Sequence, residues 1–401
     1  MLSTLRYRNF RNLWLGSFAS YAGQWIQQAT IAWLAYDMTG SSSLLGAIMG
    51  MRAIPMFLCA PIAGVAADRY DRRGLLLASQ LVSAFTALIF GIVLAAGAAH
   101  IWHLFVFVLV SGIGSVLDRP VRLTIIFDLV PREEAMQAVA LNMVAFSVTR
   151  VGGPALAGFL IGWVGAAGNL FVQTAAFFIA AATAVVIVFP QQTRQATGRS
   201  AVAELIEGLR YAVTNRNTRA LLAAGIMPFF LLVPIFAGLL PIYAKDIYHS
   251  GPEVLGMLMT SVGVGGVAGG WIAGKCMRFS RQGLVQACAI FGMSIAFTAL
   301  AFAPSVPFAC AALGVAGVGE MVHFTSNQAT LQMCVPDAMR GRIASLLQFY
   351  PGFISLGVMV AGVLAAVIGI QLLTCLLAAT AAVLAGLLLT PGGGLNAVRV
   401  S

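Results

Sequence analysis

The chain is dominated by a succession of long apolar runs, each separated from the next by a short polar gap. A helix that crosses the hydrocarbon core of a bilayer needs about 20 mostly apolar residues. Twelve runs reach this length, over about 12–36, 43–66, 74–97, 102–128, 137–161, 168–189, 220–243, 254–273, 283–303, 306–333, 343–367 and 370–390. The sequence therefore predicts an all-α integral membrane protein with 12 transmembrane helices.

The composition indicates lipid rather than water as the solvent. Hydrophobic residues make up 60% of the 401 residues, and Asp, Glu, Lys and Arg only 9%, whereas a soluble domain is about 25% charged. The net charge is +10, but the basic residues lie in gaps between apolar runs, so we expect no nucleic-acid partner. The six cysteines stand singly, without a CxxC pair, so we expect neither a disulfide framework nor a metal site. We also expect no cofactor.

A polar interval over 190–219 divides the runs into two sets of six. We expect an N-terminal six-helix bundle over 1–189, a linker over 190–219 and a C-terminal six-helix bundle over 220–401. Apolar residues of the linker recur at helical spacing, at Val202, Leu205, Ile206, Leu209 and Val213. This pattern predicts a short amphipathic helix that lies on the bilayer surface.

Basic residues give the topology. Most of the 23 Lys and Arg fall before the first run, after every second run and in the linker, whereas the gaps on the opposite side hold only Lys245. Positive residues concentrate on the cytoplasmic side of membrane proteins. We therefore expect both termini and the linker to lie in the cytoplasm.

The two halves of the chain repeat weakly. GIGSVLDRPVRLTIIFDLVP (112–131) parallels GVGEMVHFTSNQATLQMCVP (317–336), and DRRGLL (71–76) parallels SRQGLV (280–285). Paired repeats of this kind are typical of secondary transporters. In the eighth run Gly266, Gly270 and Gly274 recur every four residues, a spacing that lets helices approach closely.

The gap between the second and third runs, GVAADRYDRRGLL (64–76), concentrates charge. It contains the series Gly64, Asp68, Arg69, Arg72 and Arg73. Topology alone explains a short Arg-rich loop. The order of these residues nevertheless resembles the G-x-x-x-D-R-x-x-R-R loop signature of the major facilitator superfamily, which often has Gly where this chain has Asp71.

Two other segments extend the resemblance. RVGGPALAG (150–158) is similar to the Gly-Pro signature of the antiporter branch of that superfamily, through Gly152, Gly153, Pro154 and Gly158. LVPREEAMQAVALN (129–142) resembles the drug and siderophore exporters of the macrolide-efflux and enterobactin-exporter type.

The resemblance implies the major facilitator fold, with two pseudo-symmetric six-helix bundles, in a monomer of the bacterial inner membrane. It implies a secondary active transporter that exports an amphiphilic small molecule, such as a drug, macrolide or siderophore-like compound, in exchange for protons. In the loop over 64–76, the gating loop of this family, Asp68 would cap the eleventh predicted span, over 343–367. Arg72 or Arg73 would pair with an acidic residue at the cytoplasmic end of the fourth predicted span, over 102–128, where Asp128 stands.

Several charged residues lie inside the predicted spans, where each costs about 2.5–3.5 kcal/mol on insertion scales. Asp118 and Arg122 are four residues apart and can pair on one helix face; the pair either supports insertion or contacts substrate. Arg150 either ties to Asp118, which we favour, or anchors an anionic group of the substrate. Arg52 has no acidic residue within a turn, so its partner comes from another helix or from the ligand.

The tenth predicted span, over 306–333, holds Glu320 and His323 one turn apart and contains no Lys or Arg. Burial without a cation favours the protonated form of a carboxyl group, so we expect Glu320, helped by His323, to carry the coupling proton. A packing hydrogen bond is the alternative. The resemblance implies that the first, fourth, seventh and tenth predicted spans line a central cavity, to which Gln24, Gln28 and Asn327 would contribute.

The sequence favours a transporter over other membrane proteins. The alternatives are a membrane-embedded enzyme, such as a transferase or hydrolase, or an importer of the same fold. An enzyme would need a cluster of nucleophilic or metal-binding residues, and the chain has neither such a cluster nor a GxSxG motif. We expect a small-molecule substrate, protons and membrane lipid as the partners of a protein that is not an enzyme.

Overall fold

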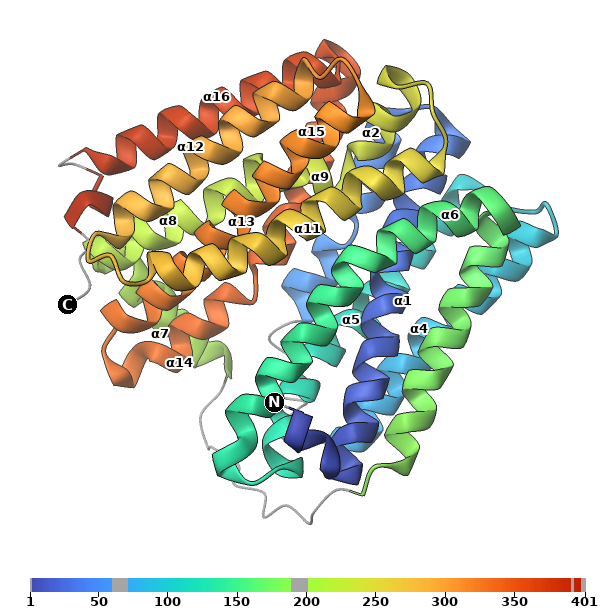
Figure 1. Cartoon of the computed structure of the whole chain (residues 1–401), viewed down its shortest axis with the longest axis horizontal. Coiled ribbons are helices and arrows are strands. Elements are labelled where there is room, and N and C mark those ends of the chain that lie inside the picture. Colours follow the sequence, from blue (N-terminus) through green and yellow to red (C-terminus); the bar gives the residue numbers. More distant parts are fainter. Residues whose placement is uncertain (1, 60–70, 189–200, 391–392, 398–401) are drawn as a thin grey trace. The chain divides into compact units, whose positions relative to one another are not determined.

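The computed structural model describes residues 2–59, 71–188, 201–390 and 393–397 (Figure 1). In that part of the chain every regular element is a helix, which confirms the predicted all-α class. The first half contains α1 (Arg8–Thr39), α2 (Ser42–Gly50), α4 (Arg72–Ala95), α5 (Ile101–Leu129) and α6 (Arg132–Val186). Short 3-10 helices, η1 (Leu2–Arg6) and η3 (Leu395–Ala397), lie near the two ends.

The second half begins with the linker helix α7 (Ala201–Thr214) and continues through a series of shorter and longer helices. These are α8 (Arg216–Leu231), α9 (Val233–Gly238), α10 (Leu240–Ile242), the π-helix η2 (Tyr243–Ile247), α11 (Pro252–Cys276), α12 (Gln282–Ala301), α13 (Val306–Cys334), α14 (Asp337–Leu347), α15 (Tyr350–Ile368) and α16 (Ile370–Leu389).

Ten helices of the described chain are long and apolar enough to cross a membrane. The difference from the predicted count arises at two places. Helix α1 is long enough, at 32 residues, but polar side chains such as Gln24, Gln27 and Gln28 lower its hydropathy. Helix α6 combines the two runs expected over 137–161 and 168–189. The count of 12 spans in two bundles stays a prediction.

Helix α6 is interrupted at Gly165. A continuous helix of 55 residues would be about 80 Å long at 1.5 Å per residue, well beyond the roughly 30 Å hydrocarbon core. Gly165 has φ 74° and ψ 170°, outside the helical region, a conformation that glycine adopts without steric cost. The chain turns back here (Figure 1), so that α6 forms two arms.

The described chain packs as two units. The first comprises residues 1–38, 54–198 and 251–256, and the second comprises 39–53, 199–250 and 257–401. The border near 198 falls inside the predicted linker, while 39–53 and 251–256 group with the other half of the sequence. Glycine contacts explain both exchanges: Gly46 of α2 packs against Gly362 of α15, and Gly158 of α6 packs against Gly256 of α11.

Each unit has its own apolar core. In the first unit, α1, α4, α5 and α6 share a cluster that includes Phe10, Leu76, Ile125 and Leu141. In the second unit, α11, α12 and α13 share a smaller cluster around Ala273, Ala289 and Val322.

The linker helix has the amphipathic pattern that the sequence predicts. Ile206, Leu209 and Val213 are exposed along one side of α7. On another side, Glu207 of α7 pairs with Arg342 of α14 at 2.5 Å, so α7 is held to α14 within the second unit. Its position on a bilayer surface stays a prediction.

The closest packing of α11 involves two glycines outside the predicted series. A Cβ at Gly265 would lie 1.9 Å from the backbone oxygen of Gly314, and one at Gly269 would lie 2.6 Å from that of Val318, both in α13. A Cβ at Gly274 would meet nothing within 4 Å. Of the predicted series, Gly266 lies at this interface, because a Cβ at Gly317 would lie 3.1 Å from its backbone nitrogen, and a Cβ at Gly270 would make an ordinary contact with Met321 of α13 at 3.8 Å. The expectation of close approach is wrong for Gly274, because the space around it is open.

We predict that Gly265→Ala destabilises the protein, because the added methyl group forces α11 away from α13. Gly274→Ala is the matched control on the same helix, and its better helix propensity is worth up to about 1 kcal/mol. Thermal unfolding of the purified protein in detergent should give a lower midpoint for Gly265→Ala and an unchanged or higher one for Gly274→Ala. Equal midpoints would contradict this packing.

Candidate functional site

A buried ion pair lies within the first unit. Asp118 and Arg122 are four residues apart on α5, and Arg122 Nε donates to Asp118 Oδ1 at 2.7 Å. Each residue is 1% exposed. Removing two charges from water costs several kcal/mol per ion unless their remaining hydrogen-bonding groups are also satisfied, so the surrounding groups decide whether this pair is stable.

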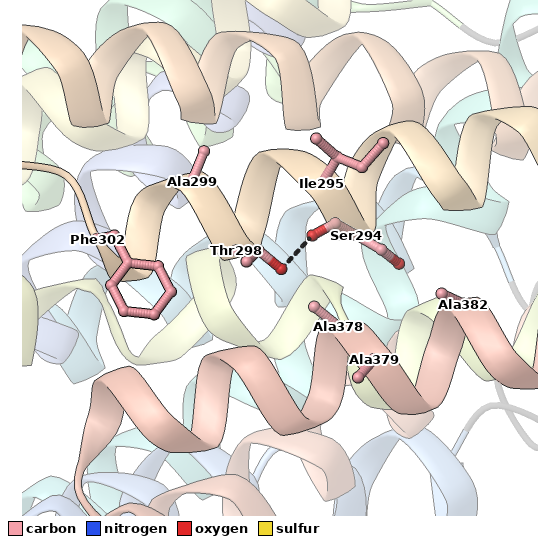
Figure 2. Close-up of a pocket in the computed structure, with 8 residues that line it drawn as sticks. All are labelled: Ser294, Ile295, Thr298, Ala299, Phe302, Ala378, Ala379 and Ala382. Atoms are coloured by element: carbon pink, nitrogen blue, oxygen red, sulfur yellow. Dashed lines mark hydrogen bonds between the residues drawn. The ribbon is translucent and has the colours of Figure 1, made fainter.

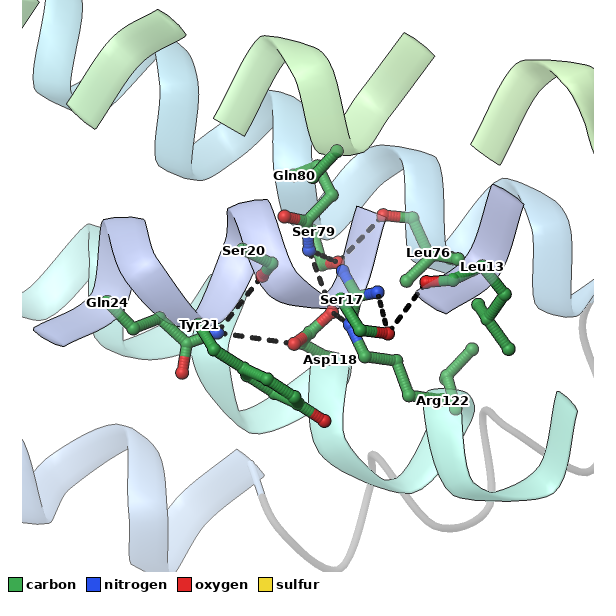
Figure 3. A network of polar contacts seen from close by, with 12 residues as sticks. Leu13, Ser17, Ser20, Tyr21, Gln24, Leu76, Ser79, Gln80, Asp118 and Arg122 are labelled. Carbon is green, nitrogen blue, oxygen red and sulfur yellow. Dashed lines mark hydrogen bonds and ion pairs between the residues drawn. The ribbon is translucent and has the colours of Figure 1, made fainter. Parts of the chain in front are cut away.

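Amide side chains from two other helices complete the coordination of the carboxylate (Figure 3). Gln80 of α4 donates from Nε2 to Asp118 Oδ1 at 2.7 Å. Gln24 of α1 donates from Nε2 to Asp118 Oδ2 at 3.3 Å. Both oxygens of Asp118 are therefore engaged by protein donors, and the charge joins α1, α4 and α5.

The guanidinium of Arg122 is held mainly by α1. Its Nη1 donates to Ser17 Oγ at 3.0 Å, and its carbon lies 5.9 Å from the ring centroid of Tyr21. Tyr21 in turn accepts a hydrogen bond from Asn142 of α6 at 3.0 Å. Nη2 of Arg122 is buried without a hydrogen-bond partner in the described chain.

Arg150 does not join this pair. The described partners of Asp118 are Gln24, Gln80 and Arg122, so the predicted tie between Arg150 and Asp118 is wrong. The guanidinium carbon of Arg150 instead lies 5.8 Å from the ring centroid of Trp25. Gln80 supplies the carboxylate contact that the sequence interpretation gave to Arg150.

The second unit contains a comparable polar cluster without a charge pair. Asn327 of α13 donates from Nδ2 to Gln286 Oε1 of α12 at 3.1 Å and to the backbone oxygen of Leu221 of α8 at 2.7 Å. Tyr350 of α15 donates its hydroxyl to Asn327 Oδ1 at 3.3 Å. Gly225 permits this approach, because a Cβ there would lie 2.1 Å from the Tyr350 hydroxyl.

His323 lies one turn before Asn327 on α13 and is 1% exposed. Its ring lies beside backbone groups of Ala224 in α8 and Gln286 in α12. Neither ring nitrogen meets hydrogen-bond geometry with a described residue. Glu320, the other predicted coupling residue, is half-buried and has contacts of its own.

The two clusters occupy corresponding positions in the two repeats. In the register that aligns 112–131 with 317–336, Asp118 corresponds to His323 and Arg122 to Asn327. Arg122 and Asn327 both bond to the first long helix of their own unit, through Ser17 and through Leu221. The first unit thus places an ion pair where the second places an uncharged amide and a histidine.

Several members of the clusters were missed by sequence reasoning, namely Ser17, Gln80, Gln286 and Tyr350. A glutamine inside an apolar run is itself a signal, because polar side chains in spans tend to face neighbouring helices. Gln28 was predicted to line a cavity. It is half-buried, has a contact of its own and belongs to neither of the two clusters described above.

The predicted charge pair at the base of α4 is present. Arg72 Nη1 donates to Asp128 Oδ2 of α5 at 2.5 Å, and Arg73 donates to the backbone oxygen of Val185. Asp71 caps α4, accepting from the backbone N–H of Gly74 at 2.9 Å, which explains an acidic residue at that position of the loop.

The rest of the loop signature, Gly64, Asp68 and Arg69, lies outside the described residues. The expected contact of Asp68 with the span predicted over 343–367 therefore stays a prediction.

The Gly-Pro segment of α6 provides close helix contacts. A Cβ at Gly153 would lie 2.6 Å from Trp25 Cβ of α1, and one at Gly158 would lie 2.5 Å from the backbone oxygen of Pro252. Pro154 is buried between them. Gly152 has open space around it, so three of the four predicted positions contribute to packing.

An apolar groove of about 450 Å³ lies between α12 and α16 (Figure 2). Its lining is mostly apolar, with the hydroxyls of Ser294 and Thr298 as the polar groups. Ile295 and Phe302 are more than 70% exposed. None of the residues of the two polar clusters lines this groove. Among the described residues no group of three His, Cys, Asp or Glu could hold a metal ion.

Comparison with known proteins agrees with this architecture. The Staphyloferrin A transporter of Staphylococcus aureus (strain NCTC 8325 / PS 47) is 25% identical over 88% of this chain and 89% of its own length. Macrolide efflux protein A of Streptococcus pyogenes is 24% identical over 84% of each chain. The enterobactin exporter EntS of Shigella boydii serotype 4 (strain Sb227) is 25% identical over 84% of this chain and 80% of its own.

A solved structure shows the fold. A bacterial homologue of the human lysosomal transporter Spinster, in its inward-facing and unoccupied conformation, superposes with a TM-score of 0.76. The match covers 98% of this chain and 99% of that one at 15% sequence identity.

The resemblance to exporters of the macrolide-efflux and enterobactin-exporter type is confirmed by these matches. Residues 1–397 also match the family described as "Transmembrane secretion effector" (MFS_3). A match over nearly the whole chain, to a family of multi-pass transporters that share this helical fold, shows that the chain belongs to the transmembrane secretion effector family.

Proposed function

We propose that the protein is a proton-coupled secondary exporter of an amphiphilic small molecule and works by alternating access. The observation that carries the proposal is the pair of polar clusters buried at corresponding positions of α5 and α13. Relatives named as macrolide efflux protein and enterobactin exporter support the direction and the substrate class. The protein acts as a monomer of the bacterial inner membrane, with both termini cytoplasmic.

The clusters support transport because burying polar and charged groups in a membrane span costs free energy that packing alone does not require. Charged residues in membrane spans cost about 2.5–3.5 kcal/mol each on insertion scales, and they mark substrate and ion pathways or proton relays. An apolar pair would join α1, α4 and α5 without that cost. A transporter, by contrast, needs polar and ionisable groups within its spans along the pathways of its substrate and ions.

The two clusters take different roles in this proposal. Asp118 and Arg122 form a fixed ionic centre of the first unit, because the carboxylate is already bound by three protein donors. His323 has a buried ring without a fixed hydrogen bond in the described chain, which suits a group that gains and loses a proton. Glu320, one turn away, exchanges the proton with His323.

We predict that single substitutions of the ion pair destabilise the protein more than the double substitution. Removing one partner leaves an uncompensated buried charge, at a cost of about 3–5 kcal/mol. Asp118→Asn and Arg122→Met should each lower the unfolding midpoint in detergent, and the double variant should recover part of the loss. Asp337 and Arg340 form an exposed pair, and the same cycle there should show little effect. Additive losses at Asp118 and Arg122 would contradict the role of a paired centre.

The ion pair of Arg72 with Asp128 belongs to the gate in this proposal, and it stabilises the state in which the cytoplasmic side is shut. We predict that Arg72→Asp lowers efflux from cells and that adding Asp128→Arg restores part of it, since the swap rebuilds the pair with opposite polarity. Arg11→Gln, an exposed residue of α1, is the control. A swap that stays as inactive as the single variant would exclude a simple charge pair.

The test of the function is transport by the purified protein in proteoliposomes with an imposed proton gradient. Wild type should move a macrolide or a cationic dye against its gradient, in the direction opposite to the protons. Glu320→Gln and His323→Gln should abolish proton-driven transport and its dependence on pH while leaving substrate exchange without a gradient. Substrate movement in the same direction as the protons would indicate an importer of this fold. Unchanged proton coupling in both variants would overturn the assignment of the coupling residues.

A further inference from the structure

Arg52 lies at a break inside a membrane-spanning segment. Helix α2 ends at Gly50, Met51 and Arg52 form a turn, and a helix resumes at residue 53 within the candidate span Ser42–Cys59. Pro55 accounts for the break, because it has no N–H to donate to the backbone oxygen of Met51 four residues earlier. The break therefore places a guanidinium beside a turn in the middle of a span.

Arg52 differs in its contacts from Arg122 and Arg150. Arg122 has the carboxylate of Asp118 and the hydroxyl of Ser17, and Arg150 has the ring of Trp25. Arg52 is half-buried, and no hydrogen bond, ion pair or aromatic contact joins it to another described residue. The guanidinium keeps its donors available while its surroundings are mostly protein.

The fold itself does not require a positive charge at this position. In the register that aligns 71–76 with 280–285, Arg52 corresponds to Ser261 of α11. The hydroxyl of Ser261 donates to the backbone oxygen of Met257 one turn earlier, at 2.9 Å. At the corresponding position the second repeat has a continuous helix with a small residue whose hydroxyl bonds to its own helix, so the repeat gives no reason for an arginine in the first half.

We infer that Arg52 binds an anionic group of the transported molecule, and that this group is a carboxylate. This inference rests on the proposed function and narrows its substrate class from amphiphilic molecules to those with a carboxylate. A guanidinium presents donors in a planar fork that matches the two oxygens of a carboxylate. In a partly desolvated setting such a pair is stronger than in water, so a neutral ester of the same molecule should bind more weakly.

The competing explanation is that Arg52 extends along its helix to the membrane–water interface, as long basic side chains do. The two explanations differ in what they predict for Lys and Gln at this position. A side chain at the interface needs only its positive charge, so Arg52→Lys would behave as wild type toward every ligand. A carboxylate fork needs both charge and shape, so Arg52→Lys should fall between wild type and Arg52→Gln.

The test uses rhodamine 110 and rhodamine 123, two dyes that differ in whether the same carboxyl group is free or a methyl ester. Fluorescence anisotropy measures their binding to the purified protein in detergent, and transport of both is measured in proteoliposomes. Wild type should bind rhodamine 110 more tightly than rhodamine 123. Arg52→Gln should weaken binding of rhodamine 110 at least tenfold and change binding of rhodamine 123 less than twofold, with Arg11→Gln as the control.

The outcomes separate the inference from the proposed function. Binding of rhodamine 110 that depends on Arg52, without transport of either dye, would retain the carboxylate site and overturn the exporter. Transport of both dyes with equal loss in Arg52→Gln would overturn the site, because the residue would then act on the fold. Equal binding of the two dyes by wild type, or binding of neither, would overturn the site as well. The unfolding midpoint of each variant verifies that it is folded.

Discussion

The first unit depends on one carboxylate. Asp118 is almost fully buried, and three side chains from α1, α4 and α5 donate to its two oxygens. A buried charge that is fully hydrogen-bonded specifies the positions of its donors, because any displacement exposes an unsatisfied group at a cost of about 1–3 kcal/mol. The apolar cluster of the same helices supplies adhesion, but apolar contacts tolerate sliding, and the carboxylate makes the arrangement of α1, α4 and α5 specific.

The ion pair of Asp118 with Arg122 can be compared with the residues at the same positions of the second repeat. At the corresponding positions the second unit has an amide in place of Arg122 and a histidine in place of Asp118, and Asn327 bonds to neighbouring helices through neutral hydrogen bonds. One repeat therefore contains a paired buried charge, while the other contains a histidine ring whose nitrogens have no hydrogen-bond partner in the described chain. In a carrier, such a division separates the structural task from the proton-handling task, and this is the physical basis of the proposed mechanism.

Particular residues show how far sequence reasoning reached. The pair of Asp118 with Arg122 and that of Arg72 with Asp128 followed from spacing and from the loop signature, because short-range helical geometry and helix order determine them. The contacts of Arg150 and of Asp118 could not be predicted in the same way. Only the packing of the helices brings Trp25 to Arg150 and Gln80 to Asp118. The glycines of α11 show the same limit. A four-residue repeat predicts that one face of the helix packs closely, but the neighbouring helix α13 decides which glycines it meets, and the closest contacts are at Gly265 and Gly269.

The sequence by itself determined that this chain is an all-helical membrane protein with a polar interval over 190–219, and that it carries the loop and helix signatures of an exporter family. Those properties depend on the hydropathy of each segment and on short motifs of neighbouring residues, both of which can be read directly from the sequence. Only the tertiary structure decided that Gln80 and Gln286 complete the polar clusters, that Gly46 meets Gly362, and that Arg52 has no bonded partner among the described residues. These facts depend on distances between helices far apart in sequence, and hydrophobic packing has no local pattern that encodes them.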